Sequence, residues 1–247
     1  MEYGQKAARL PKSAKDKEKW QRIVVILEHC PLETVHTDTR GFELLCERHK
    51  NIHKQRGTDP AEWRPDVVHQ CLLHLMDSPL NRAGMLEVYV HTKKGALIAV
   101  DPRIRIPRCA RLFEKMMTMA LYKLKIRATT GYLSLLKVIK NPITDHLPAD
   151  TRFVRVEKDG DLVDPFAFAQ HMYPTNHSTS KVVQNPSPVA FVIGGMSRGD
   201  VCVEYAKQGL VPSIRIADRG LSGAATCSAI LNAFERHWLE DDYVECM

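Results

Sequence analysis

Two short runs made entirely of apolar residues, Ile23 to Leu27 and Val189 to Ile193, constrain the fold of this 247-residue chain most strongly. Such runs are typical of strands buried on both faces, as in a parallel sheet covered by helices. An amphipathic helix is predicted between Pro65 and Ser78-Pro79, with its apolar stripe at Val68, Cys71, Leu72, Leu75 and Met76. Strands mixed with helices predict an α/β fold.

The other elements are expected from local patterns. Helices are predicted over 41–56, 107–124 and 221–238, and a further strand over 135–140. Strands at 86–92 and 96–100 flank Lys93-Lys94-Gly95, which is typical of a hairpin. The stretch 157–188 contains four prolines and many polar residues, so an irregular insertion is expected there.

Positive charge is concentrated in two parts of the chain. Lysine and arginine number 35 against 29 acidic residues, a net charge of +6, which favours a polyanionic partner. Between Arg103 and Arg127 there are eight basic residues and one acidic residue. Residues 1–19 are basic and lack the apolar stretch of a secretory signal, so we expect a disordered tail suited to nuclear targeting or loose RNA contact. No run of about 18 apolar residues predicts a membrane span.

Seven cysteines without repeated spacing favour a reducing compartment over a disulfide scaffold. Cys46, His49 and His53, with Cys30 upstream, are residue types that bind zinc, but their spacing is not a paired Cys-x-x-Cys arrangement. The same residues fit one face of the helix expected over 41–56. We therefore predict structural histidines and a core thiol, and no metal.

Residues 101–111, Asp-Pro-Arg-Ile-Arg-Ile-Pro-Arg-Cys-Ala-Arg, predict a basic surface. Arg103 and Arg105 alternate with isoleucines, the period of a strand or extended segment with one buried face. Arg108 and Arg111 fall one helical turn apart after Pro107, which suits a first helical turn. Guanidinium groups bind phosphate bidentately, so the pattern indicates a nucleic-acid surface. Taken alone, the run is equally typical of a solvated basic face.

Two glycine-containing turns follow apolar strands late in the chain. The first, Gly194-Gly195-Met196-Ser197-Arg198-Gly199, lacks the Gly-Lys-Ser/Thr ending of a P-loop, and too few residues follow it for a dinucleotide-binding fold. The second runs from Ile216 to Ser222 and precedes a helix that opens with small residues. Each alone reads as a simple turn, with Ser222 as an N-cap. Together they favour a ligand pocket at the carboxyl ends of buried strands.

Four motifs resemble the pseudouridine-methylating ribosome-biogenesis family, which belongs to the SPOUT class of knotted methyltransferases. They are Arg64-Pro65-Asp66-Val67-Val68-His69-Gln70, Leu75-Met76-Asp77-Ser78-Pro79-Leu80-Asn81, Arg105-Ile106-Pro107-Arg108 and Leu135-Leu136-Lys137-Val138-Ile139-Lys140-Asn141-Pro142-Ile143-Thr144-Asp145-His146. The resemblance covers roughly residues 20 to 240. It implies one domain over 20–247, with a mostly parallel sheet flanked by helices and a C-terminal trefoil knot.

The resemblance also implies a function. The family uses S-adenosylmethionine to methylate one pseudouridine of small-subunit ribosomal RNA, as a homodimer that works with pre-ribosomal assembly proteins in the nucleolus. The cofactor site carries over to Gly194, Gly199, Ile216, Ala217, Asp218, Arg219, Gly220, Leu221 and Val156. The second loop departs from the family's Ser-Asn-Tyr-Pro-Leu-Ser and reads Ala-Asp-Arg-Gly-Leu-Ser over 217–222. Backbone contacts to adenine survive that change.

The family's RNA-contacting arginines correspond to Arg64, Arg105 and Arg108, and Asp66 resembles the carboxylate that orients the first of them. An aspartate there also suits the start of a helix without any such role. A further arginine of that surface is replaced by Leu112, and we expect its neighbour Arg111 to bind RNA instead.

No residue is marked by spacing as a catalytic base. Two other functions remain open from the residues alone. One is a non-catalytic RNA-binding assembly factor that keeps the methyltransferase fold, and the other is a generic α/β nucleotide-binding enzyme.

Overall fold

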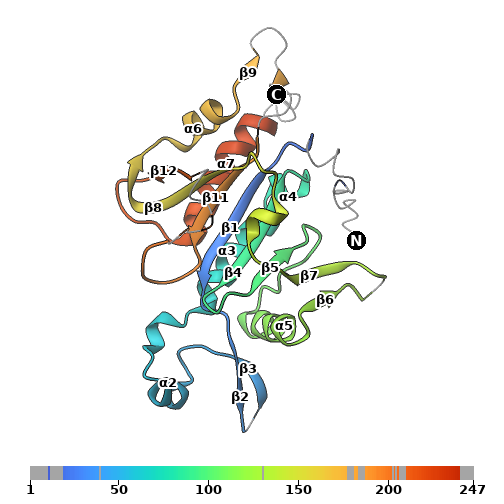
Figure 1. Cartoon of the computed structure of the whole chain (residues 1–247), viewed down its shortest axis with the longest axis vertical. Helices are drawn as coiled ribbons and strands as arrows, with labels where there is room; N and C mark the ends of the chain where they lie inside the picture. Colours follow the sequence, from blue (N-terminus) through green and yellow to red (C-terminus); the bar gives the residue numbers. More distant parts are fainter. Residues whose placement is uncertain are drawn as a thin grey trace.

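The computed structural model describes residues 11, 19–38, 40–129, 131–176, 181–182, 187–201, 203, 205 and 210–239. Most of the expected basic tail, residues 1–10 and 12–18, lies outside this part of the chain. An eight-stranded sheet with the order β12-β8-β11-β1-β4-β5-β7-β6 forms the centre (Figure 1). Its strands are β1 (Ile23–Cys30), β4 (Leu86–Thr92), β5 (Leu97–Val100), β6 (Lys125–Arg127), β7 (Ser134–Ile139), β8 (Arg152–Leu162), β11 (Val189–Gly194) and β12 (Leu210–Arg215).

The sheet is parallel over its first five strands, from β12 to β4, and antiparallel from β4 to β6. The two apolar runs form β1 and β11, which pair with each other near the middle, as predicted. Both strands have neighbours on both sides and apolar cover on both faces, so nearly every side chain in them is buried. The mostly parallel α/β architecture is confirmed.

Helices cover one face of this sheet. They are α3 (Pro65–Asp77), the short α4 (Pro79–Arg82), α5 (Ala110–Lys123), α6 (Pro165–Met172) and α7 (Gly223–Leu239). The predicted stripe of α3 is buried, and it packs with Val25 and Leu27 of β1 in one large core. Inward-facing Ile230, Leu231 and Phe234 of α7 join this core. No helix in the described part of the chain is long and apolar enough to cross a membrane.

The opposite face of the sheet is covered differently. Val24 and Ile26 of β1 pack there against the 3-10 turn η2 (Ile143–His146) and against Val201 and Val203. This second core is smaller, and irregular segments rather than long helices cover it within the described residues. Met196, in the turn that follows β11, also packs against this second core.

The helix expected over 41–56 is wrong in its first half. Gly41–Leu44 is strand β3, which pairs antiparallel with β2 (Thr34–Thr37), and only Lys50–Arg56 is helical as α2. Gly41 has a φ of +72°, so the chain turns there instead of entering a helix. The hairpin and α2, followed by the 3-10 turn η1 (Pro60–Glu62), project from one end of the sheet (Figure 1).

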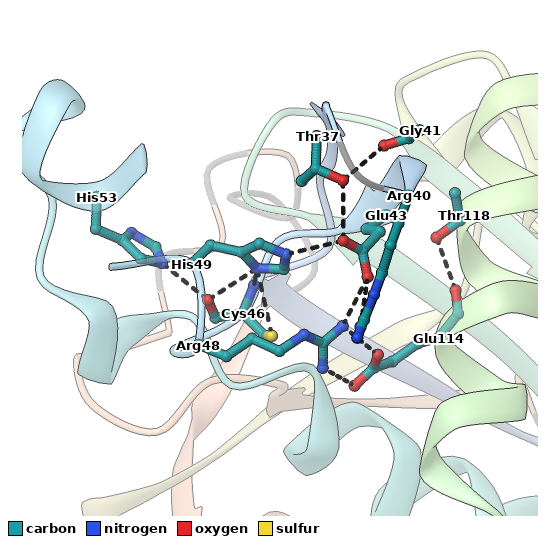
Figure 2. A network of polar contacts seen from close by, with 10 residues as sticks. All are labelled: Thr37, Arg40, Gly41, Glu43, Cys46, Arg48, His49, His53, Glu114 and Thr118. Atoms are coloured by element: carbon teal, nitrogen blue, oxygen red, sulfur yellow. Dashed lines mark hydrogen bonds and ion pairs between the residues drawn. The ribbon is translucent and has the colours of Figure 1, made fainter. Parts of the chain in front are cut away.

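Cys46, His49 and His53 bind protein groups around this hairpin (Figure 2). His53 Nε2 lies 3.0 Å from the Cys46 carbonyl oxygen, and His49 Nδ1 accepts from the Cys46 backbone N–H at 3.1 Å. Among the described residues no cluster of histidine, cysteine and acidic side chains is arranged to hold a metal. Their structural role is thus supported by direct hydrogen bonds.

Two further boundaries differ from the sequence prediction. The helix expected from 107 begins at Ala110, because Cys109 keeps an extended backbone at its N-cap. The insertion expected over 157–188 is partly regular. Strand β8 continues to Leu162, and Asp164 caps α6 by accepting from the Ala167 N–H at 2.7 Å. Two short strands, β9 (Thr175–Asn176) and β10 (Lys181–Val182), follow, and residues 177–180 and 183–186 lie outside the described part.

Candidate functional site

A cavity of about 420 Å³ lies where β11 and β12 end, against the middle of β8 and the first turn of α7. All but one of the nine residues predicted to hold a cofactor line it. They come from three segments: Val156 of β8; Gly194 and Gly199 after β11; and Ile216, Ala217, Arg219, Gly220 and Leu221 after β12. The structure therefore brings the two glycine-containing turns to one site.

Asp218 is the exception, because it does not line the cavity, and its predicted contact with the cofactor stays a prediction. Its side chain is 82% exposed, and Arg215 Nη1 donates to its backbone carbonyl oxygen at 3.4 Å. This hydrogen bond across the turn directs the residue to solvent. Sequence reasoning also missed several lining residues: Glu157, Lys158, Arg198, Asp200, Arg215 and Thr226. These residues show no repeated spacing in the sequence. Their only signal is that they lie close along the chain to residues that were already predicted.

Glycines make the close packing at this cavity possible. Gly199 has a φ of +108°, a conformation that other residues rarely adopt. At Gly223, which begins α7, a Cβ atom would lie 3.1 Å from Cys71 Sγ and 3.3 Å from the Gly194 carbonyl oxygen. The start of α7 thus approaches the end of β11 so closely that a Cβ atom at position 223 would push its neighbours by a few tenths of an ångström.

The thiols beneath the cavity are neutral. The hydrogen bond to Cys71, followed by burial, raises the pKa of the Cys227 thiol well above its usual value. Burial likewise raises the pKa of Cys30. A thiol that stays protonated is a weak nucleophile, so Cys30 and Cys227, which are core residues and do not line the cavity, serve packing.

The basic segment 101–111 packs beside α3. His69 Nε2 of α3 donates to the Pro107 carbonyl oxygen at 2.6 Å, and the His69 ring stacks on Phe113 at 4.4 Å. Ile104 and Ile106 are buried, whereas Arg103 and Arg105 are exposed, which confirms the predicted alternation. The segment begins with a turn, in which the Ile104 N–H donates to the Asp101 carbonyl oxygen at 3.0 Å. Its only backbone hydrogen bond to the sheet among the described residues comes from the Asp101 N–H, which donates to the Leu135 carbonyl oxygen of β7 at 2.9 Å.

Two of the predicted RNA-contacting arginines already have carboxylate partners. Arg64 binds Asp66 bidentately, through Nε at 2.9 Å and Nη2 at 2.6 Å. Arg108 Nη2 lies 2.6 Å from Asp77 Oδ2 at the other end of α3. At about 1.5 Å per residue, these two pairs are separated by about 16 Å along the helix.

The arginines therefore form an extended surface, not a single cluster. Arg105 and Arg111 are exposed on either side of Arg108 in the sequence, and neither makes an ion pair with another described residue. Leu112, which stands where the family has a further arginine, is 54% exposed. Arg111 and Leu112 both face solvent, so the compensation expected of Arg111 stays a prediction.

Asp66 lies in the first turn of α3, where its carboxylate faces the Arg64 guanidinium. The hydrogen bond from Arg64 lowers the pKa of Asp66 below its usual value. Both side chains are about 40% exposed, which means that solvent weakens their attraction. The fork geometry of Arg64 is nevertheless fixed, as expected for an oriented anion-binding arginine.

A parallel α/β sheet with a small-molecule cavity at its strand ends, beside an exposed arginine surface, defines a cofactor-binding protein of the α/β class. Comparison with known proteins assigns it further. The sequence profile of the family described as EMG1/NEP1 methyltransferase matches residues 25–235. The chain belongs to this family.

Individual relatives agree with that assignment. The chain is 42% identical to the ribosomal RNA small subunit methyltransferase NEP1 of Homo sapiens over 219 residues, which covers 88% of this chain and 82% of the relative. It is 39% identical to NEP1 of Candida albicans, covering 88% of this chain and 79% of the relative. The crystal structure of Archaeoglobus fulgidus Nep1 bound to S-adenosylhomocysteine has the same fold, with a TM-score of 0.63 at 20% identity over 88% of this chain and 99% of that one.

Proposed function

We propose that this protein transfers the methyl group of S-adenosylmethionine to N1 of a pseudouridine in small-subunit ribosomal RNA. Family membership, the names of the relatives and the S-adenosylhomocysteine in Archaeoglobus fulgidus Nep1 support this proposal. The cavity is the observation that supports the proposed function most strongly, because residues that the family's motifs assign to the cofactor come from three separate segments and meet there.

The residues present fit such a cofactor. A volume of about 420 Å³ is within the range of small-molecule sites. Ile193, Ile216 and Leu221 offer apolar contacts for adenine, and the backbone of 216–221 offers hydrogen bonds to its edge. Carboxylates at Glu157 and Asp200 and guanidinium groups at Arg198 and Arg219 suit the amino-acid end of the cofactor.

Methyl transfer requires mainly that the methyl group and the target nitrogen are aligned. When bound, S-adenosylmethionine supplies a methyl group on an activated sulfonium. The protein's residues hold the cofactor and the base in line and exclude water, and such positioning accounts for much of a rate enhancement. We nominate no proton acceptor for the target nitrogen. A base inside RNA structure must be splayed out to reach a cavity of this kind.

The arginine surface is proposed to hold the RNA. Arg64 precedes α3, Arg105 and Arg108 lie in the segment packed beside α3, and Arg111 lies in the first turn of α5. The Arg64 and Arg108 ion pairs are about 16 Å apart along α3, a distance that spans several phosphates. Asp66 fixes the Arg64 fork for one of them. Arg108 would exchange its carboxylate partner Asp77 for a phosphate oxygen, since that pair is mostly exposed and weak.

We also propose the trefoil knot of the SPOUT class for the last part of the chain. In support, the turns at 194–199 and 216–221 face one cavity, and β12 pairs with β8 instead of with β11, which precedes it along the chain. A crystal structure that traces residues 202–209 through the loop decides this point.

Dimerisation, assembly partners and location are further proposals. A homodimer would place basic residues of both subunits on the phosphates that flank the target, and light scattering of the purified protein tests it. Pre-ribosomal assembly proteins are the proposed partners, and co-purification from nuclear extract tests them. The nucleolus is the proposed location, and imaging of a tagged chain with and without residues 1–19 tests it.

Titration calorimetry combined with methyl transfer separates catalysis from binding alone. The wild-type protein is expected to bind S-adenosylmethionine and to transfer labelled methyl to an RNA hairpin of the small subunit. Binding of RNA without binding of the cofactor at millimolar concentration would establish the non-catalytic assembly factor instead.

A further inference from the structure

A cluster of three titratable side chains lies behind the cofactor cavity, on the face of the sheet that Ile26 lines. At its centre is Glu28, near the end of β1, which is only 2% exposed. Its Oε2 accepts from the Tyr205 hydroxyl at 2.8 Å, and its Oε1 pairs with His91 Nδ1 of β4. A carboxylate buried this deeply is costly unless such partners satisfy it.

Glu28 also binds the cofactor turn through its main chain. The Gly195 N–H donates to the Glu28 carbonyl oxygen at 2.7 Å. Gly195 begins the turn, and residues 196–201, all of which line the cofactor cavity, lie between Gly195 and Tyr205 in the sequence. One residue of β1 therefore holds both sides of the segment that forms this wall of the cavity.

Gly195 is held at very short range. A Cβ atom at this position would lie 2.3 Å from Cys30 Sγ and 3.4 Å from the Glu28 carbonyl oxygen. Because Cys30 is fully buried, it has little room to withdraw. The close approach is thus built into the sequence at the point where the turn meets β1.

Tyr205 is partly buried and packs against the second core, and this packing leaves one side of it open. Another cavity, of about 400 Å³, opens between the cluster and η2 and is lined by Glu28, His91, Asn141 and Tyr205 together with Ile26, Leu97, Pro142 and Ile143. Tyr205 therefore has open space on one side, and its other described ring contact is an edge contact with Phe153 at 6.0 Å. The hydrogen bond to Glu28 is the directional contact that sets its position.

The phenol stays protonated under ordinary conditions. Burial, followed by the charge of Glu28 and the hydrogen bond to it, raises the pKa of Tyr205 far above its usual value. The hydroxyl consequently remains a donor to the carboxylate across the whole range in which the protein is handled.

We propose that Glu28 is a positioning residue for the cofactor turn, acting through Gly195 on one side and Tyr205 on the other. This inference rests on the proposed function, since the turn matters to catalysis only if the cavity holds the cofactor. His91 supports the arrangement by satisfying the second carboxylate oxygen. None of the three side chains is assigned to the reacting atoms.

Tyr205→Phe and Glu28→Gln test the proposal, and Tyr89→Phe is the matched control. Tyr89 is also a buried phenol, and it donates to the Glu87 carboxylate at 2.7 Å. Burial raises its pKa in the same way, but Tyr89 lies in β4 and not in the segment that follows the cofactor turn. The control thus removes the same kind of hydrogen bond from the same face of the sheet.

Calorimetric affinity for S-adenosylhomocysteine is the first measurement. The loss of a hydrogen bond to a charged group predicts roughly tenfold weaker binding for Tyr205→Phe and Glu28→Gln. Tyr89→Phe is expected to bind within about twofold of wild type even where it lowers the melting temperature as much. The double variant should bind about as weakly as either single one, because both changes break one contact.

Hydrogen–deuterium exchange of residues 195–201 in the free protein is the second measurement. Exchange should rise in both test variants and stay unchanged in Tyr89→Phe. Equal affinity and equal exchange in Tyr205→Phe and wild type would overturn the proposal, as would affinity losses that merely follow melting temperature in all three variants. A wild-type protein that fails to bind S-adenosylhomocysteine contradicts the proposed function, and the exchange rates then still decide the role of Glu28.

Discussion

Substitutions of Asp66 allow its effect on stability to be measured separately from its effect on RNA binding. Its carboxylate is held by two hydrogen bonds from Arg64 and lies in the first turn of α3. Asp66→Asn removes the charge and keeps the side-chain shape, whereas Asp66→Gly also adds backbone freedom within the helix. Comparison of the two variants isolates the ion pair from the backbone effect.

The expected magnitudes follow from exposure. With both side chains about 40% exposed, the pair contributes about 0.2 to 1 kcal/mol, and the favourable position at the helix start contributes about 0.3 to 1 kcal/mol. Asp66→Asn should therefore cost about 1 kcal/mol. Asp66→Gly should cost about 1 to 3 kcal/mol, because glycine in a helix adds up to about 1 kcal/mol. For a chain of this size the glycine variant melts roughly 2 to 10 °C lower.

The pH dependence gives the sign of the effect. Because Arg64 lowers the pKa of Asp66 in the folded protein, its contribution is fully present above the ordinary value of 3.8 and is lost as the pH falls through the lower folded value. Calorimetric melting of wild type and Asp66→Asn should thus differ at neutral pH and converge in acid.

RNA affinity is measured on the same proteins with a small-subunit hairpin. Both variants should bind RNA more weakly, since Arg64 loses its fixed orientation, and S-adenosylhomocysteine should bind the folded fraction normally. An Asp66→Asn variant that melts and binds RNA like wild type would refute the role of this pair.

Further changes test the site. Arg108→Ala and Arg111→Ala should each weaken RNA binding and reduce the slope of log affinity against log salt by about one. An unchanged slope in both variants would show that neither arginine belongs to the RNA surface. Gly199→Val should abolish cofactor binding in a folded protein, since its φ of +108° disfavours a branched side chain; normal binding would place the site elsewhere. Gly195→Ala should weaken S-adenosylhomocysteine binding by contact with Cys30 Sγ, and Cys30→Ala in the same chain should restore part of it; no restoration contradicts the contact.

The sequence was most informative where a pattern is local. Residues 23–27 of β1 and 189–193 of β11 are wholly apolar because both faces of these strands are covered, and Gly194 and Gly199 lie at and just after the end of β11. Helix α3 begins at Pro65 and ends at Asp77, directly before Ser78-Pro79, as predicted. These features need no knowledge of distant contacts.

Elements fixed by pairing or by tertiary contacts were missed. The spacing of Leu45, Cys46 and His49 imitates a helix face, but antiparallel pairing of β2 and β3 and the turn at Gly41 prevail upstream. Asp218 lies in the loop that departs from the family's motif; its side chain is exposed, and its carbonyl oxygen accepts from Arg215. The cluster around Glu28 joins residues 63 and 177 positions away in sequence, so no local spacing announced it.

Mass spectrometry of nucleosides from a small-subunit RNA hairpin tests the central claim most directly. The hairpin carries a single pseudouridine, and a matched hairpin carries uridine at the same position. Wild-type protein with S-adenosylmethionine should produce N1-methylpseudouridine from the first hairpin only, and Gly199→Val should produce none. If wild type binds both the cofactor and the pseudouridine hairpin but yields no methylated nucleoside, the protein is not the methyltransferase described above.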